Sequence, residues 1–120
     1  MKFTGLVPLL RTHDLQATIA FYRDLLGMEC VAQTEDWAAL AKDQLEIMVA
    51  TPNAHEPFDK AVFTGSLYIR CEDADAVWNQ LKTKASVVYP LEDFEYGMRE
   101  FAIRDNNGYV LQFGTPLEDE

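Results

Sequence analysis

The sequence has few of the features that mark a disulfide scaffold, a membrane protein or a secreted protein. Only two cysteines occur, Cys30 and Cys71, both on apolar stretches typical of strands, which favours reduced buried thiols over a disulfide or a nucleophile. No apolar run approaches the length of a bilayer span, and the N-terminus lacks the charged-then-apolar pattern of a signal peptide. We therefore expect a cytoplasmic protein without a membrane partner.

Basic residues are also scarce. Ten Lys and Arg oppose 20 Asp and Glu, which gives a net charge of −10. Because phosphate binding needs a basic patch, this balance argues against a nucleic-acid partner. The acidity is compatible with a cationic ligand and equally with solubility alone. The two histidines, His13 and His55, fall in loop-like segments, where a surface or capping role is expected rather than metal ligation.

A stretch near the C-terminus shows the clearest pattern. Residues 98–103 alternate between two faces, Asp105–Gly108 forms a turn, and residues 109–113 alternate again, so this stretch predicts a β-hairpin. One face is strongly apolar and the other carries Glu100 and Gln112. That second face either lines a cleft or lies in water.

The whole chain reads as strand, helix and three strands, twice over. Pro8 interrupts the first strand and predicts an edge or a break there. Besides the hairpin, the expected elements are strands Phe3–Arg11, Met28–Thr34, Trp37–Lys42, Gln44–Thr51, Ser66–Cys71 and Ala85–Tyr89, a helix Leu15–Leu26, and a helix with Ala74, Val77, Trp78 and Leu81 on one face.

The two halves also match locally. Asp14 and Asp73 precede the two helices in similar tetrapeptides, and Thr51-Pro52 and Thr115-Pro116 close the two halves. This weak repeat predicts an α+β fold of paired βαβββ modules, with mixed sheets curled around a cleft. The expected arrangement is a single domain over residues 1–120, made of modules 1–52 and 64–116 joined by loop 53–63.

Two stretches resemble a known family: Asp14-Leu15 through Phe21-Tyr22-Arg23-Asp24-Leu25-Leu26-Gly27, and Gly97-Met98-Arg99-Glu100-Phe101 through Arg104-Asp105-Asn106-Asn107-Gly108. With them the chain resembles the vicinal-oxygen-chelate (VOC) superfamily of glyoxalase I, extradiol dioxygenases and fosfomycin- and bleomycin-resistance proteins. Counterparts to Val7-Pro8, Asp36-Trp37-Ala38 and Tyr96–Phe101 make it most similar to bleomycin-resistance proteins. The resemblance implies the paired βαβββ fold. In that branch it also implies a domain-swapped homodimer, whose first strand crosses to the partner at a hinge matching Pro8.

The resemblance also locates the metal ligands of the superfamily's enzymes. They fall here on Val7, Glu46, Ser66 and Gln112. Val7 has no donor atom, Ser66 is a poor ligand, and only Glu46 is a good one, whereas a divalent metal needs three or four converging donors. We therefore expect no metal and no other cofactor.

What remains is a cleft with aromatic and acidic lining. Glu46 is expected to be at least half-buried, so it should pair with an arginine, act as a base with a raised pKa, or meet a cationic ligand. Arg99 and Glu100 are expected to form a cross-strand or rim charge pair. Aromatic positions of bleomycin-resistance proteins are Ala32 and Ser66 here, which disfavours bleomycin itself. The predicted ligand-binding residues are Trp37, Glu46, Met48, Ser66, Tyr68, Tyr96, Glu100 and Gln112.

Three functional hypotheses follow. The first is a metal-free protein of the bleomycin-resistance type that sequesters an amphipathic or cationic small molecule, with an antibiotic-resistance-like role. The alternative is a divergent glyoxalase-like lyase or isomerase, or a dioxygenase-like enzyme, with Glu46 as its catalytic residue and a divalent metal. The third is an accessory protein that uses only its dimer surface.

Overall fold

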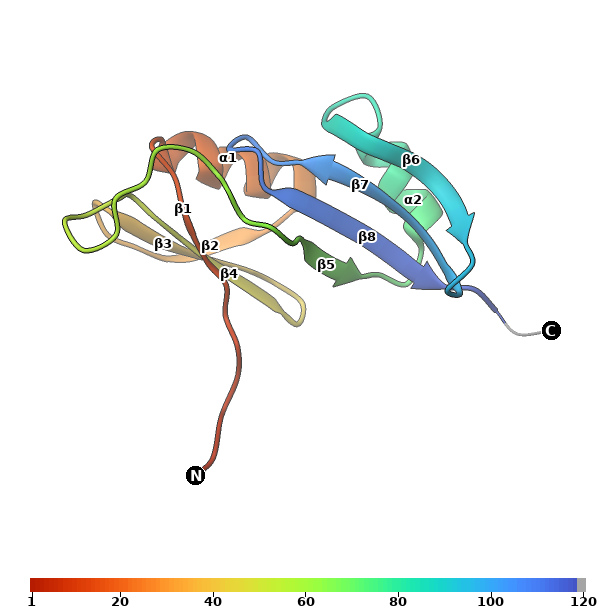
Figure 1. Cartoon of the computed structure of the whole chain (residues 1–120), viewed down its shortest axis with the longest axis horizontal. Coiled ribbons are helices and arrows are strands. Elements are labelled where there is room, and N and C mark those ends of the chain that lie inside the picture. Colours follow the sequence, from red (N-terminus) through yellow and green to blue (C-terminus); the bar gives the residue numbers. More distant parts are fainter. Residues whose placement is uncertain (119–120) are drawn as a thin grey trace. The chain divides into compact units, whose positions relative to one another are not determined.

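The computed structural model describes residues 1–118; Asp119 and Glu120, the end of the predicted domain, lie outside them. The chain divides into two compact units, Met1–Lys60 and Ala61–Glu120. Each unit consists of one four-stranded mixed sheet and one helix (Figure 1). The predicted α+β fold is therefore confirmed. No helix within residues 1–118 has the length and apolarity needed to cross a bilayer.

The first unit has the strand order β1-β4-β3-β2. β1 runs parallel to β4, and the other neighbours are antiparallel. Its elements are β1 (Leu9–Arg11), α1 (Leu15–Leu26), β2 (Glu29–Gln33), β3 (Trp37–Lys42) and β4 (Leu45–Ala50).

Helix α1 has the bounds that the sequence predicts. The Asp14 side chain accepts a hydrogen bond from the backbone N–H of Ala17 and caps the N-terminus. Gly27 ends the helix with a left-handed φ of 72°, a conformation that costs glycine little. Ile19 and Tyr22 lie on the buried side of the helix, which packs on β2, β3 and β4.

The first strand is much shorter than predicted. The sequence predicts a strand over Phe3–Arg11, but pairing with β4 begins only where the carbonyl of Pro8 accepts a hydrogen bond from Met48, at 2.8 Å. Proline has no N–H to donate, so the ladder cannot continue through it. The side chains of Phe3 and Leu6 before it are 83% and 94% exposed.

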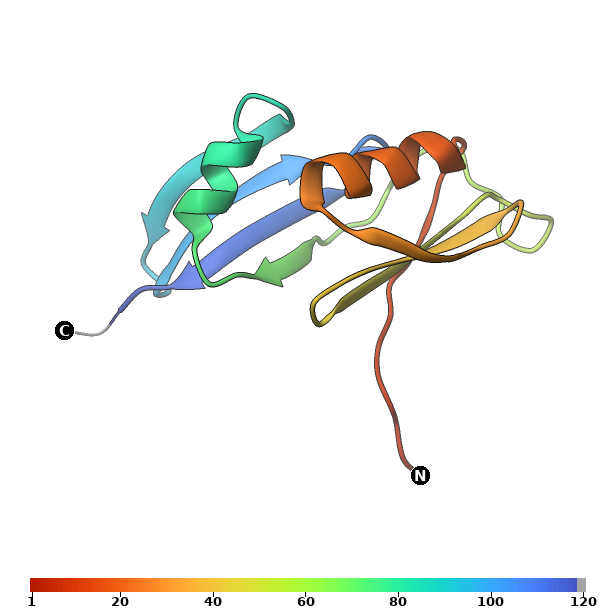
Figure 2. The same cartoon turned by 180° about the vertical axis from the view of Figure 1, so that it is seen from behind.

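The second unit has the equivalent order β5-β8-β7-β6, again with one parallel pair, β5 with β8. Figure 2 shows α2 against one face of this sheet. On that face the ring of Phe101 lies 5.1 Å from both Trp78 and Phe113, so the helix side is apolar. The elements are β5 (Leu67–Arg70), α2 (Ala74–Leu81), β6 (Ser86–Phe94), β7 (Met98–Arg104) and β8 (Val110–Pro116).

The β7–β8 hairpin is confirmed, with its turn where the sequence predicts it. The Asp105 carboxylate accepts hydrogen bonds from the backbone N–H groups of Asn107 and Tyr109, and Gly108 takes a φ of 99°. β6 runs on to Phe94, past its predicted end at Tyr89. Two register shifts lie around Pro90, which an edge strand tolerates.

Candidate ligand-binding site

The face of the second sheet opposite α2 carries a buried polar cluster. Successive strand residues point to opposite faces, so Glu100 and Gln112 project away from the helix that covers Phe101 and Phe113. Glu100 is 0% exposed. A carboxylate removed from water in this way must be compensated by hydrogen bonds or by a positive charge.

Hydrogen bonds provide this compensation. The Tyr68 hydroxyl, from β5, donates to Oε1 of Glu100 at 2.8 Å. The Tyr89 hydroxyl, from β6, donates to Oε2, and Nε2 of Gln112 donates to the same oxygen at 3.2 Å. The Tyr96 hydroxyl lies near enough to the carboxylate to act on its pKa. We call Tyr68, Tyr89, Tyr96, Glu100, Gln112 and Ser66, which bonds to Gln112, the Glu100 cluster.

The hydrogen bonds of the cluster all run toward the carboxylate. Ser66 Oγ donates to Oε1 of Gln112, and Nε2 of Gln112 donates to the Tyr89 hydroxyl at 2.8 Å, which in turn donates to Glu100. This direction fixes the orientation of the Gln112 amide. It also concentrates the polarisation of the network on one negative charge.

Two small residues make this convergence possible. Ala102 lies between Gln112 and Tyr89 in the register of the sheet, so no long side chain separates them. Gly114 is the strand partner of Glu100, and a Cβ there would lie 2.1 Å from the Tyr68 hydroxyl oxygen. Gly114 therefore leaves the space through which Tyr68 reaches the carboxylate.

The electrostatics of the cluster favour an ionised Glu100 and protonated tyrosines. Burial acts to raise the pKa of Glu100, but the phenol groups of Tyr89, Tyr96 and Tyr68 and the Gln112 amide outweigh it, so its pKa lies below the ordinary value. Burial and the hydrogen bond to Glu100 raise the pKa of Tyr89 to about 12. The Glu100 carboxylate, followed by burial, raises the pKa of Tyr96 to about 12. Burial and then Glu100 also raise the pKa of Tyr68.

Aromatic rings continue from the cluster toward solvent. The Tyr89 ring meets Phe94 edge-on at 5.5 Å, and Phe94 stacks on Tyr96 at 5.4 Å with 5° between the planes. The Tyr96 side chain is 57% exposed, and that of Tyr68 is 40% exposed. The face thus combines a buried negative charge with exposed aromatic surface.

The structure brings together five of the eight predicted ligand-binding residues: Ser66, Tyr68, Tyr96, Glu100 and Gln112. The other three, Trp37, Glu46 and Met48, lie in the first unit on β3 and β4. Trp37 and Met48 are half-buried. Glu46 is exposed in this chain, so the expectation of at least half-burial is wrong; the buried glutamate is Glu100.

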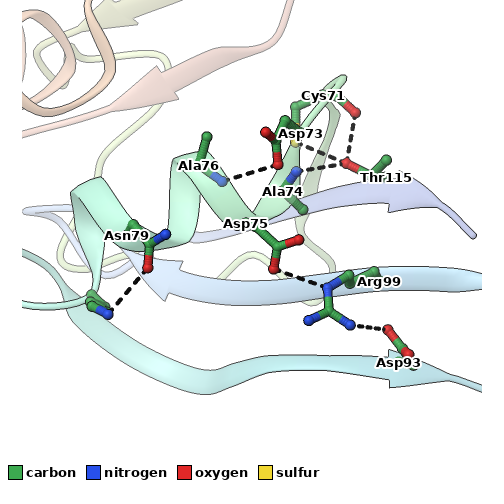
Figure 3. Close-up of polar contacts among 10 residues, drawn as sticks. Cys71, Asp73, Ala74, Asp75, Ala76, Asn79, Asp93, Arg99 and Thr115 are labelled. Atoms are coloured by element: carbon green, nitrogen blue, oxygen red, sulfur yellow. Dashed lines mark hydrogen bonds and ion pairs between the residues drawn. The ribbon is translucent and has the colours of Figure 1, made fainter.

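The predicted charge pair between Arg99 and Glu100 is also wrong. Because adjacent strand residues face opposite ways, Arg99 lies on the helix side of the sheet, where Figure 3 shows it between Asp75 and Asp93. Its Nε lies 3.0 Å from the Asp75 carboxylate, and its Nη1 lies 2.7 Å from that of Asp93. Glu100 therefore has no ion pair with Arg99 and accepts hydrogen bonds from Tyr68 and Tyr89 instead.

The Thr115 hydroxyl connects β8 to the start of α2 on the same side (Figure 3). It donates to the carbonyl of Cys71 at 2.9 Å and accepts from the backbone N–H of Ala74 at 2.8 Å. Cys71 and Cys30 are both free thiols, as predicted, although half-buried rather than buried. Burial raises the pKa of the Cys71 thiol.

Comparison with known proteins identifies the family. The model of the Glyoxalase/Bleomycin resistance protein/Dioxygenase superfamily matches residues 6–113. The chain belongs to this superfamily. No curated protein sequence matches the chain significantly.

Solved structures of the superfamily fold resemble the chain over nearly its full length. A lactoylglutathione lyase from Agrobacterium tumefaciens has a TM-score of 0.75 at 22% identity, covering 93% of this chain and 92% of that one. A glyoxalase/bleomycin resistance protein/dioxygenase from Nocardioides has a TM-score of 0.81 at 17% identity, covering 100% and 87%. TioX from Micromonospora sp. ML1 has a TM-score of 0.75 at 21% identity, covering 96% and 100%. At these identities the likeness establishes the fold.

The donor set does not fit the metal that the resemblance to superfamily enzymes implies. Of the four corresponding positions, Val7 has no donor, and Ser66 and Gln112 are hydrogen-bonded to each other. Across residues 1–118, no three His, Cys, Asp or Glu side chains gather as a metal site would require. We therefore derive no chemical step through a metal.

Sequence reasoning missed three residues of this face, Tyr89, Phe94 and Gly114. Tyr89 and Phe94 lie on the part of β6 that surrounds Pro90, and a proline argues against a continuous strand. Alternation from the hairpin partner β7 would have reached them if the edge position of β6 had been assumed. Gly114 gives no signal of its own, since its role depends on the rotamer of Tyr68.

Proposed function

We propose that this domain binds an amphipathic small molecule at the Glu100 cluster and holds it without chemical conversion, as a sequestering protein of the bleomycin-resistance type would. The observation that carries the proposal is the saturated state of Glu100. A carboxylate with three hydrogen-bond donors and a lowered pKa is a weak base. Tyrosines with raised pKa values are weak acids. The cluster suits recognition better than proton transfer.

The exposed surface supports an amphipathic ligand. Small-molecule sites combine apolar and aromatic walls with a few fixed polar groups. Here Tyr68, Tyr96 and Phe94 offer ring surface, and the hydrogen bond to Glu100 holds the Tyr68 hydroxyl group in place. Rings held in this way lose little conformational entropy on binding.

A ligand panel tests the proposal. Cationic, neutral and anionic aromatic amphiphiles are titrated while tryptophan fluorescence and the NMR signal of the Gln112 side-chain amide are followed. We expect at least one class to bind and to shift the Gln112 signal. Tyr68→Leu should weaken that binding, and the matched variant Tyr68→Phe, which keeps the ring, should weaken it less. Absence of binding across the panel would contradict the proposal.

We also propose that the protein forms a homodimer in the cytoplasm, with the segment before Pro8 crossing to the partner. The support is the segment before Pro8, which has no strand pairing in this chain (Figure 1). Phe3 and Leu6 in this segment are exposed. A second copy of the chain could pair its backbone and cover its apolar side chains. Sedimentation should show a dimer that weakens when residues 1–7 are deleted. A monomeric full-length chain would contradict this.

The enzymatic alternative, a glyoxalase-like lyase or isomerase or a dioxygenase-like enzyme using Glu46, has less support, because Glu46 is exposed on β4. Metal analysis of protein purified without chelators tests it. Stoichiometric nickel, zinc, iron or manganese, lost in Glu46→Gln, would favour the enzyme over the metal-free binder.

A further inference from the structure

We propose that the ligand of the Glu100 cluster is an organic cation, a quaternary or protonated amine on an apolar body, received by the Tyr68 and Tyr96 rings in front of Glu100. This inference rests on the binding function proposed above and specifies its ligand. The starting point is the negative charge of Glu100, which uncharged hydrogen-bond donors do not neutralise.

Glu100 is buried, yet all its hydrogen-bond partners are neutral. Two phenols and one amide donate to it, and none of the ion pairs formed within residues 1–118 includes it. Neutral donors spread the charge but do not cancel it. Buried carboxylates are usually paired with a cation, so a site with a net charge of −1 and no paired cation is best completed by a cationic ligand.

The other charged residues on this face do not neutralise the charge of Glu100. Arg70 and Glu92 occupy the same register row as Glu100 on the two edge strands of the sheet, and both are exposed. Arg70 is two strands away, about 10 Å at the usual strand spacing, and Glu92 is one strand away. Their opposite charges offset each other in water, whereas the charge of Glu100 lies in a less polar environment.

The tyrosines carry this charge to the surface. A phenol that donates a hydrogen bond to a carboxylate gains electron density in its ring and on its oxygen. Cation–π attraction depends on the negative ring face, so the exposed Tyr68 becomes a stronger cation acceptor than an isolated tyrosine, and the exposed Tyr96 adds a second ring. Each hydroxyl oxygen also keeps a lone pair for an ammonium N–H.

The chemistry favours an organic cation over a metal ion or an anion. Calcium and magnesium need several oxygen ligands, whereas the cluster has one carboxylate that is already occupied by donors. An anion would meet Glu100 and the net charge of −10. A weakly hydrated ammonium group loses little solvation on an aromatic surface and is attracted by the same field.

A pair of isosteric probes tests the inference. Benzyltrimethylammonium and neopentylbenzene have nearly the same shape and differ in charge, and benzylamine separates hydrogen bonding by an ammonium N–H from cation–π contact. We expect benzyltrimethylammonium to bind about tenfold more tightly than neopentylbenzene, and the Gln112 side-chain amide signal to shift with it. Tighter binding of benzylamine than of benzyltrimethylammonium would assign the hydroxyl oxygens as the main acceptors and also support the inference.

Variants show whether Glu100 is the source of the preference. Glu100→Gln keeps the shape and should reduce the preference for the cation to about onefold. Glu72→Gln removes one negative charge from an exposed residue outside the cluster and should leave the preference unchanged. If Glu100→Gln does not fold, Tyr68→Phe together with Tyr96→Phe keeps both rings but removes both hydroxyl groups and the hydrogen bond from Tyr68 to Glu100. This double variant should reduce the preference severalfold.

The outcomes separate this inference from the binding function. Equal binding of the two isosteres, or a preference that survives in Glu100→Gln, would overturn the cation site and leave small-molecule binding intact. If no cation binds but other members of the amphiphile panel do, the inference alone fails. A chain that binds neither the isosteres nor any panel member would overturn both.

Discussion

Replacement of Gly114 by alanine is the most direct test of how the cluster is built. The new Cβ would lie 2.1 Å from the Tyr68 hydroxyl oxygen, 2.8 Å from its Cζ and 3.1 Å from Cε of Met98. Non-bonded heavy atoms rest at about 3.5 Å or more, so Tyr68 must move by about 1 Å or more. The flexible end of Met98 can give way, but Tyr68 cannot shift so far and keep its 2.8 Å hydrogen bond to Glu100.

The magnitude follows from that hydrogen bond. A hydrogen bond to a charged group contributes about 1.5–3 kcal/mol, and the partial exposure of Tyr68 places the loss near the lower end. Alanine in a strand recovers about 0.5–1 kcal/mol relative to glycine. We expect Gly114→Ala to lower the free energy of unfolding by about 0.5–1 kcal/mol, measured by urea denaturation with circular dichroism.

A double-mutant cycle isolates the cause. In a Tyr68→Ala background the clash is gone, so Gly114→Ala should be neutral or slightly stabilising there. Cation affinity should fall in Gly114→Ala even where the protein is fully folded. An alanine variant as stable as the parent, or one equally destabilised in both backgrounds, would refute the assigned role of Gly114.

Three further predictions concern other contacts. The pKa values of Tyr89 and Tyr96 are raised to about 12, so ultraviolet titration should show two tyrosines that ionise late and that ionise at lower pH in Glu100→Gln. The stabilisation that accompanies these raised pKa values is complete below about pH 10, the ordinary tyrosine pKa. It is lost as the pH rises through about 12. Thr115→Val should lower the free energy of unfolding by about 1–2 kcal/mol because the N–H of Ala74 loses its acceptor, and Thr115→Ser should restore it. Arg99→Gln should cost less than about 1 kcal/mol by the same denaturation assay, because both of its ion pairs are exposed; a larger loss would mean that they are not screened by solvent.

The sequence predicts most of the fold because its signals are local. Alternation, the Asp14 and Asp73 caps and the Asp105–Gly108 turn determine the helices and the hairpin. The predicted start of the first strand is wrong, because Pro8 has no N–H to donate and strand pairing begins only after it. The predicted end of β6 before Pro90 is also wrong, because β6 is an edge strand and an edge strand accepts a proline that a central strand would not.

The site is less predictable because it depends on contacts between strands. Parity places Glu100 and Gln112 on one face, and this is confirmed. Parity does not tell which glutamate is buried: both Glu46 and Glu100 are predicted to line the cleft, burial is expected of Glu46, and the buried one is Glu100. The pairing of Arg99 with Asp75 and Asp93 also depends on residues far away in sequence.

The shared strand order of the two sheets has a consequence for stoichiometry. In the second sheet, Ala102 pairs with Gln112, and two residues further along the strands Glu100 pairs with Gly114. The corresponding pairs in the first sheet are Ala41 with Glu46 and, two residues further along, Ala39 with Met48. The first sheet therefore has the same strand arrangement but no carboxylate at the position that corresponds to Glu100. Calorimetry should count one cation per chain, because the two halves share their architecture and not their chemistry.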